Sequence, residues 1–186
     1  MKNNILLAAL LVTSSCALAG PGGYVGVNAG STQHNINFDG ESGSDTSTGV
    51  KVYAGFQVTP AIGVEAGYVR FGEIDESDSE FSLSYKPNAF YAAVTGTMAI
   101  SPGFDLIGKV GVARSDSKIA VSYLDMRASL KDDVVSALFG IGVQYKFSET
   151  MSVVAEYENY GKIAKYEEVD LTDKAALVSV GLRIAF

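Results

Sequence analysis

The residue types that could carry catalysis are few, and they lie in polar stretches of the chain. His34 is the only histidine, and Asp78 and Ser79 are neighbours in a second polar stretch. Serine, histidine and aspartate can act as a nucleophile, its general base and the group that orients the base. Because no local motif orients His34, we predict no catalytic residue and no enzyme. A loop-borne lipid-modifying enzyme ranks third among our hypotheses.

Metal, cofactor and nucleic-acid sites leave no signature in this sequence. Ligand clusters at metal spacing and phosphate-binding glycine loops are absent, so we predict neither a metal nor a cofactor. The acidic stretch at residues 73–80 could hold divalent cations, but it lacks the spacing of a calcium loop, and a solvated face is the simpler interpretation. The formal net charge of −7, without a basic stripe, argues against nucleic acid as a partner.

Another set of polar residues lies inside segments of alternating apolar and polar character. Three basic and three acidic residues share the parity opposite to the apolar side chains, together with one glutamine: Lys51, Lys109, Arg183, Glu65, Glu156, Glu158 and Gln144. Buried charges must be paired or hydrated. Two hypotheses stay open for this set. It is either a static polar core or a gate of exchangeable ion pairs, built on Glu65, Lys109 and Glu156, that passes small ions.

The elements that position these charges are strands with one wholly apolar face. Residues 50–58 and 62–70 alternate with period two on either side of Thr59-Pro60-Ala61, which predicts a hairpin with a very short turn. The opposite face mixes glycine with Lys51, Gln57 and Glu65. A soluble barrel or sandwich needs a polar outside and an apolar inside, whereas an apolar outside around a polar inside is typical of a barrel in lipid.

The same pattern recurs along the rest of the chain and predicts the fold class. We expect an all-β, eight-stranded, antiparallel up-and-down transmembrane barrel with short turns at Thr59, Ser101 and Ser148. Long polar loops should join the strands at the other end, and residues 119–123 should extend a strand pair beyond the membrane. The predicted strands cover 24–31, 50–58, 62–70, 90–100, 106–114, 135–147, 153–158 and 176–186, and the predicted loops cover 32–48, 73–88, 115–133 and 159–174.

The first 19 residues have the charged, apolar and small-residue regions of a secretory signal peptide, ending in Ala17-Leu18-Ala19. Their apolar run is shorter than the roughly 20 residues of a spanning helix. We therefore predict residues 1–19 as signal peptide and residues 20–186 as one barrel domain. Cys16 could instead become a lipid-modified N-terminus, although Thr13 stands where an apolar residue would be expected.

Aromatic and basic residues mark the borders of the predicted lipid-facing band. The aromatic side chains suit an interfacial girdle at the two membrane surfaces: Phe56, Tyr145, Phe147 and Phe186 near the turns, and Tyr68 and Tyr157 near the loops. Arg70 and Arg114 keep the lipid-facing parity where their strands leave the membrane toward the long loops. They could bind phosphates of an outer-leaflet glycolipid, or simply extend their charges to the interface.

Four segments carry a family resemblance: KVYAGFQVTPAIGVEAGYVRFG, DLIGKVGVARSD, GIGVQYKFSETMSVVAEYENY and SVGLRIAF. Together they resemble the N-terminal barrel of OmpA-type proteins and the small barrels related to it. The resemblance implies a location in the outer membrane of a Gram-negative-type envelope. It also implies that the last strand presents Ser179, Gly181, Ile184 and Phe186 as an assembly signal to the barrel-insertion machinery.

The resemblance is incomplete in two respects. OmpA-type proteins carry a peptidoglycan-binding domain after the barrel, and we expect none here, so cell-wall anchoring is not implied. Glu65, Lys109 and Glu156 match charged lumen positions of the family, but Val94, Gln144 and Val154 stand where charged partners would be expected.

These observations lead to one leading function and one runner-up. We expect a structural and surface-interaction role, with envelope integrity or adhesion served by the loops. The expected partners are outer-membrane lipids including glycolipid, the insertion machinery, and a host, phage or cell-surface partner that the sequence does not identify. A weak ion or small-solute channel is the alternative.

Overall fold

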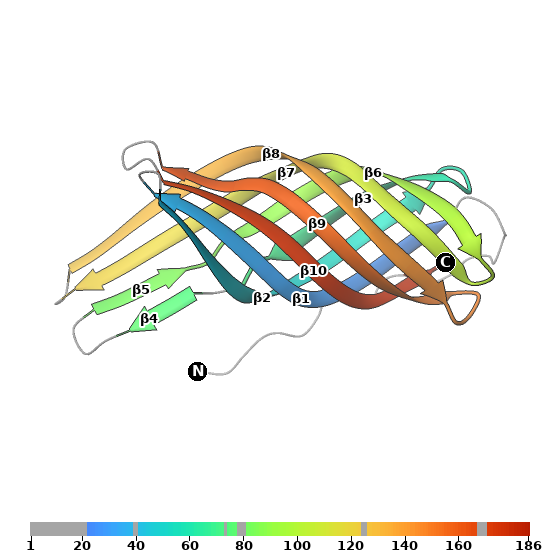
Figure 1. Ribbon diagram of the computed structural model, residues 1–186, viewed down its shortest axis with the longest axis horizontal. Coiled ribbons are helices and arrows are strands. Elements are labelled where there is room, and N and C mark those ends of the chain that lie inside the picture. Colours follow the sequence, from blue (N-terminus) through green and yellow to red (C-terminus); the bar gives the residue numbers. More distant parts are fainter. Residues whose placement is uncertain (1–21, 39–40, 73, 78–80, 124–125, 167–170) are drawn as a thin grey trace.

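The computed structural model describes residues 22–38, 41–72, 74–77, 81–123, 126–166 and 171–186 (Figure 1). The described residues contain no helix long and apolar enough to cross a membrane. They form ten strands: β1 (Gly23–Phe38), β2 (Glu41–Gln57), β3 (Ile62–Arg70), β4 (Ile74–Ser77), β5 (Phe81–Tyr85), β6 (Asn88–Ser101), β7 (Phe104–Tyr123), β8 (Met126–Lys146), β9 (Met151–Tyr166) and β10 (Leu171–Ala185).

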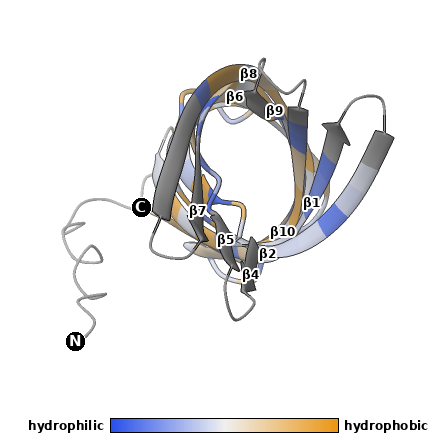
Figure 2. Cartoon of the chain, turned by 90° about the vertical axis from the view of Figure 1, so that its left-hand side faces the viewer, coloured by the Kyte–Doolittle hydropathy of each residue, from blue (hydrophilic) through white to orange (hydrophobic). Residues whose placement is uncertain are grey.

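Eight of these strands close into a barrel, and β4 and β5 add a hairpin outside it. The barrel strands follow the order β7-β6-β3-β2-β1-β10-β9-β8, and the β7–β8 pairing closes the ring. Every pair is antiparallel, and Figure 2 shows the ring from its loop end. Closure leaves no edge strand within the membrane, where unpaired backbone groups could not be hydrated. The predicted eight-stranded up-and-down barrel is confirmed.

Short turns join strands at the end that carries the C-terminus (Figure 1). The Oγ1 atom of Thr59 accepts a hydrogen bond from the backbone N–H of Ile62 at 3.0 Å, and the Oγ atom of Ser148 accepts one from Met151 at 2.9 Å. In the third turn Gly103 has a φ of 81°, which a glycine adopts without strain. The three short turns therefore lie where the sequence predicts them.

The long polar connections are wrong as predictions of loops, because strands occupy most of them. Residues 32–48, for example, belong largely to β1 and β2, which stay paired up to Phe38↔Glu41. Backbone hydrogen bonds do not depend on the polarity of the side chains, so a hairpin can continue into water. The predicted extension at residues 119–123 is confirmed, because Ile119–Tyr123 pairs with both β5 and β8.

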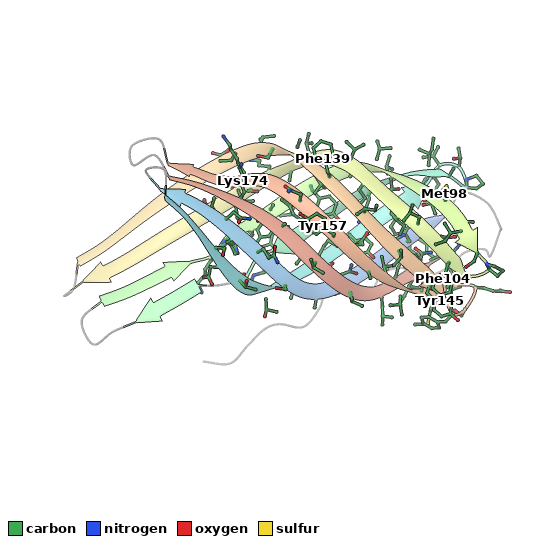
Figure 3. The ribbon with its side chains drawn as sticks, viewed as in Figure 1. Met98, Phe104, Phe139, Tyr145, Tyr157 and Lys174 are labelled. Carbon is green, nitrogen blue, oxygen red and sulfur yellow. The ribbon has the colours of Figure 1, made fainter. Side chains whose placement is uncertain are left out.

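The outward-facing side chains form an apolar band around the middle of the barrel. Along β1 they change from Val25, Val27 and Ala29 to Ser31, Gln33 and Asn35, so the lipid-facing part of this strand ends near Ala29. Many large apolar side chains are about half exposed, among them Phe139 at 58% and Ile141 at 56%. Figure 3 shows side chains standing outward from the barrel wall along this band. This arrangement matches a lipid solvent.

Candidate functional site

The candidate site is the polar network inside the barrel. Alternation along each strand points every second side chain inward. All seven predicted lumen residues are buried, and the structure brings them into one connected set with Asp105 and four tyrosines. In order of position these are Tyr24, Lys51, Tyr53, Glu65, Tyr91, Asp105, Lys109, Gln144, Glu156, Glu158, Tyr160 and Arg183.

Lys51 lies at the loop side of this network and is fully buried. Its ammonium group donates to the carboxylate of Glu156 at 2.5 Å and to that of Glu158 at 2.6 Å. Lys51 is on β2, and both glutamates are on β9, on a different side of the ring. Two charge-assisted hydrogen bonds satisfy a cation that would otherwise be strongly destabilising in the interior.

Lys109 connects the same two carboxylates to Glu65. Its ammonium nitrogen lies 2.6 Å from Glu156, 2.7 Å from Glu65 and 3.2 Å from Glu158. The three residues of the hypothetical ion-pair gate, Glu65, Lys109 and Glu156, are therefore in direct contact. One cation shared by three carboxylates could exchange partners without becoming unpaired.

Arg183 continues the network toward the short turns. Its guanidinium group donates to the Oε1 atom of Gln144 at 2.8 Å and lies 3.5 Å from the Glu65 carboxylate. Beyond Gln144, Asp105 pairs with the half-exposed Lys146 at 2.7 Å. The network of polar side chains thus reaches the rim of the barrel at the turn end.

Tyrosines supply the partners that the sequence analysis missed. The hydroxyl groups of Tyr24 and Tyr91 donate to the Glu65 carboxylate at 2.9 and 2.7 Å. The Arg183 guanidinium lies 4.3 Å from the centre of the Tyr24 ring, a cation–π distance. Each of these tyrosines occupies the inward-facing parity of its own strand, and this pattern could have identified them from the sequence.

Val94 is wrong as a lumen position, because it is 51% exposed on the outer face.

His34 forms a second polar cluster on the loop side of the network. It lies in strand β1 and is fully buried, so placing it in an exposed loop was wrong. Its Nδ1 atom is 3.1 Å from the Asp173 carboxylate, and its Nε2 atom is 3.1 Å from the Ser47 hydroxyl. Ser47 donates to the carbonyl oxygen of Phe71. Asp78 and Ser79, the other two residues considered for catalysis, lie outside the described residues.

This cluster favours a protonated histidine. It lies beyond the lipid-facing part of β1, which ends near Ala29. Burial disfavours the charged ring, but the hydrogen bond and negative charge of Asp173, with the Phe71 carbonyl, outweigh burial and raise the pKa of His34 above 6.5. Since the Ser47 hydroxyl proton points to Phe71, both ring nitrogens can donate. The arrangement suits a structural link between β1, β2 and β10 better than a nucleophile and its base. We call His34, Ser47 and Asp173 the His34 cluster.

The predicted girdle residues lie on the outer surface. Phe56, Tyr145, Phe147, Tyr157 and Phe186 are each between 45% and 49% exposed, and Tyr68 stacks against Phe90 with ring centres 4.8 Å apart. Figure 3 shows Tyr145 near the turn end and Tyr157 nearer the middle of the barrel.

The two predicted phosphate-binding arginines also face outward, and Arg114 has an acidic partner. The guanidinium of Arg114 is 2.9 Å from the Asp133 carboxylate, and both side chains are exposed. Arg70 lies opposite Val50 and Asn88 on the neighbouring strands. The predicted signal peptide at residues 1–19 lies outside the described residues.

Comparison with known sequences gives a family match over the whole described region. Residues 22–186 match the OmpA-like transmembrane domain. Outer membrane protein A of Yersinia pseudotuberculosis is 27% identical over 196 residues, covering 100% of this chain and 55% of that protein. Outer membrane protein P5 of Haemophilus influenzae is 27% identical over 195 residues, covering 91% and 54%. The chain thus spans about half the length of these relatives.

Solved structures show the same fold at low sequence identity. Neisserial surface protein A has a TM-score of 0.60 at 17% identity, covering 88% of this chain and 97% of that one. Ail, the attachment invasion locus protein of Yersinia pestis, has a TM-score of 0.57 at 18% identity, covering 87% and 99%. Ail has also been solved with the heparin analogue sucrose octasulfate, at a TM-score of 0.56 and 19% identity, covering 87% and 99%.

Proposed function

Since the chain belongs to the OmpA-like transmembrane domain family and is an outer-membrane β-barrel, we propose that it serves envelope structure and surface interaction rather than catalysis. The observation that carries this proposal is the lumen. Charges on β2, β3, β7, β9 and β10 meet in its centre in ion pairs of 2.5 to 3.5 Å. Such cross-barrel pairing favours a rigid scaffold over an open pore.

The interacting surface in this proposal is the sheet that extends beyond the membrane. The hairpin β4–β5 pairs with the outer part of β7, which in turn pairs with β8, and this sheet projects from the loop end of the barrel (Figure 1). A sheet anchored on a closed barrel presents a defined surface to a host cell, phage or other cell. Ail, whose name describes attachment and invasion, is a similar barrel and supports the proposal.

The test is removal of the β4–β5 hairpin by replacing residues 73–87 with a short turn. We expect the variant to keep a heat-modifiable, protease-resistant barrel, because β3 and β6 still pair from Ile62↔Gly96 to Arg70↔Asn88. Adhesion of cells displaying the variant should fall at least several-fold relative to the unaltered protein. Unchanged adhesion at equal surface display would refute a role for this sheet.

Weak ion conduction is the second candidate, and the position of Lys109 favours it. Because its three carboxylate partners lie within 3.2 Å, partner exchange could open a path through the network. The prediction is that Glu65→Gln or Lys109→Met changes single-channel conductance in a planar bilayer. Absence of conductance in the unaltered protein and both variants would exclude the channel.

Two further residue sets enter this proposal from the sequence. We propose that Arg70 and Arg114 contact phosphates of outer-leaflet lipid, with Asp133 competing for Arg114. We also propose that Ser179, Gly181, Ile184 and Phe186 form the signal for the barrel-insertion machinery. Phe186→Ala should slow insertion without changing the stability of the inserted barrel, which a comparison of assembly rates and unfolding midpoints would test.

A further inference from the structure

Two lysines lie directly opposite each other on the outer wall of the barrel. Lys174 on β10 is the cross-strand partner of Lys162 on β9, and both side chains are exposed. Like charges at opposed positions of a sheet are destabilising. Neither ammonium group forms an ion pair with a described residue, in contrast to Arg114, which has Asp133 at 2.9 Å. Among the described residues, the pair therefore forms a two-cation site without a carboxylate partner.

The local backbone accounts for this placement. Gly161 has a φ of 64°, a left-handed conformation that favours glycine. Before Gly161 the even-numbered side chains up to Tyr160 point inward, and after it the side chain of Ile163 points inward. Lys162 therefore faces outward. On β10 Lys174 lies between the buried Asp173 and Ala175, so regular alternation points it outward. The left-handed Gly161 in β9 and the register shifts between β9 and β10 thus bring the lysines side by side.

The pair lies at the loop-side border of the apolar band. Along β10 the exposed outward residues that follow Lys174 toward the turns are Val178, Val180, Leu182 and Ile184, whereas Ala176, which was predicted to face outward, is buried. In Figure 3 Lys174 lies on the loop side of Phe139 and Tyr157. The long extracellular connections of an outer-membrane barrel lie at this end. The two ammonium groups are therefore at the headgroup level of the outer leaflet.

An apolar groove begins next to Lys162. The backbone pairing of β8 with β9 ends at Phe139↔Asn159, and beyond it the hydroxyl group of Ser136 donates to the carbonyl oxygen of Lys162 at 2.7 Å. The groove between the two strands is lined by Ala137, Phe139, Ile141, Tyr157, Asn159 and Gly161, with Lys162 at its edge. Phe139, Ile141 and Tyr157 are 45% to 58% exposed. A charged headgroup on the lysines would thus have its acyl chains beside an aromatic and aliphatic surface.

We propose that Lys162 and Lys174 bind a phosphate group of an outer-leaflet glycolipid whose acyl chain packs in the groove between β8 and β9. This inference rests on the outer-membrane location and is independent of the adhesive role. One phosphate between the two ammonium groups neutralises their repulsion and accepts hydrogen bonds from both. Asn159 supplies an amide within the groove for the hydroxyl groups of the sugar.

The test compares lipid retention by the refolded protein and its variants in nanodiscs. The probe is the bisphosphorylated acyl disaccharide lipid A, with its dephosphorylated form as the chemical control, and bound lipid is counted by native mass spectrometry. The double variant Lys162→Gln/Lys174→Gln removes both charges and keeps hydrogen-bonding side chains. Lys146→Gln, at the turn end of the barrel, is the matched control. Heat-modifiability establishes that each variant is folded.

We expect the double variant to bind lipid A at least ten-fold more weakly than the unaltered protein, while Lys146→Gln stays within two-fold. Dephosphorylated lipid A should bind the unaltered protein and the double variant equally weakly. Equal binding of lipid A by the unaltered protein and the double variant would overturn the proposal. The two lysines would then only extend their charges to the membrane surface. Equally tight binding of phosphatidylglycerol, lost in the same variant, would overturn the choice of glycolipid.

A second measurement separates binding from stability. Without lipid A, the double variant should have a melting temperature equal to or above that of the unaltered protein, because the repulsion between the lysines is gone. Lipid A should raise the melting temperature of the unaltered protein more than that of the variant, since a ligand stabilises the state that it binds. An equal rise for both proteins would contradict the site.

Discussion

Replacing Lys51 with methionine tests the interpretation of the lumen as a balanced ion-pair network. The central network has three cations, Lys51, Lys109 and Arg183, and three carboxylates, Glu65, Glu156 and Glu158. Lys51 is 0% exposed and lies 2.5 and 2.6 Å from two of the carboxylates. Lys51→Met therefore leaves one uncompensated negative charge in the interior.

The expected cost follows from that imbalance. Removing one partner of a buried ion pair lowers the free energy of unfolding by about 3–5 kcal/mol. In the double variant Lys51→Met/Glu158→Gln the numbers of cations and carboxylates are equal again. We expect this variant to be more stable than Lys51→Met alone, with a coupling free energy on the order of 1–3 kcal/mol.

The assay is equilibrium urea unfolding in lipid vesicles, followed by circular dichroism and by the electrophoretic mobility of the folded band. Tryptophan fluorescence cannot be used, because the chain contains no tryptophan. Arg114→Met is the control, since both side chains of its pair with Asp133 are exposed, at 64% and 58%, and a surface pair contributes about 0–1 kcal/mol. A loss for Lys51→Met no larger than for Arg114→Met would refute the network as a source of stability.

Three further predictions concern the His34 cluster and the packing of the lumen. Because the folded pKa of His34 is raised above 6.5, the stability that it adds is fully present below pH 6.5 and is lost as pH rises through the folded pKa; unfolding midpoints of the unaltered protein and His34→Gln should therefore converge at high pH. Gly55→Val should cost about 1–3 kcal/mol in urea unfolding, since a Cβ atom on Gly55 would lie 2.2 Å from the Tyr24 ring, and no loss would show that the ring moves freely. Leu138→Ala removes a fully buried side chain and should cost about 2–5 kcal/mol, whereas Val135→Ala on the outer face of the same strand, 67% exposed, should cost much less in the same assay.

The sequence by itself determined which side of each strand faces lipid. Parity is a local property of an extended chain, because successive side chains point to opposite faces. Lys51, Glu65 and Arg183 could therefore be placed inside, and Phe56 and Phe139 outside, before any pairing was known. The turns at Thr59 and Ser148 were also local, because their side chains accept hydrogen bonds from backbone groups three residues away.

Only the tertiary structure decided which inward charges meet. Lys51 and Glu158 are 107 residues apart, and their contact depends on the strand register and on closure of the ring. The same holds for His34, whose partner Asp173 lies 139 residues away on the other strand that pairs with β1. The Lys162–Lys174 pair depends on the left-handed Gly161 and on the register shifts between β9 and β10. Gly161 interrupts the regular alternation of β9, on which an interpretation of the sequence pattern depends.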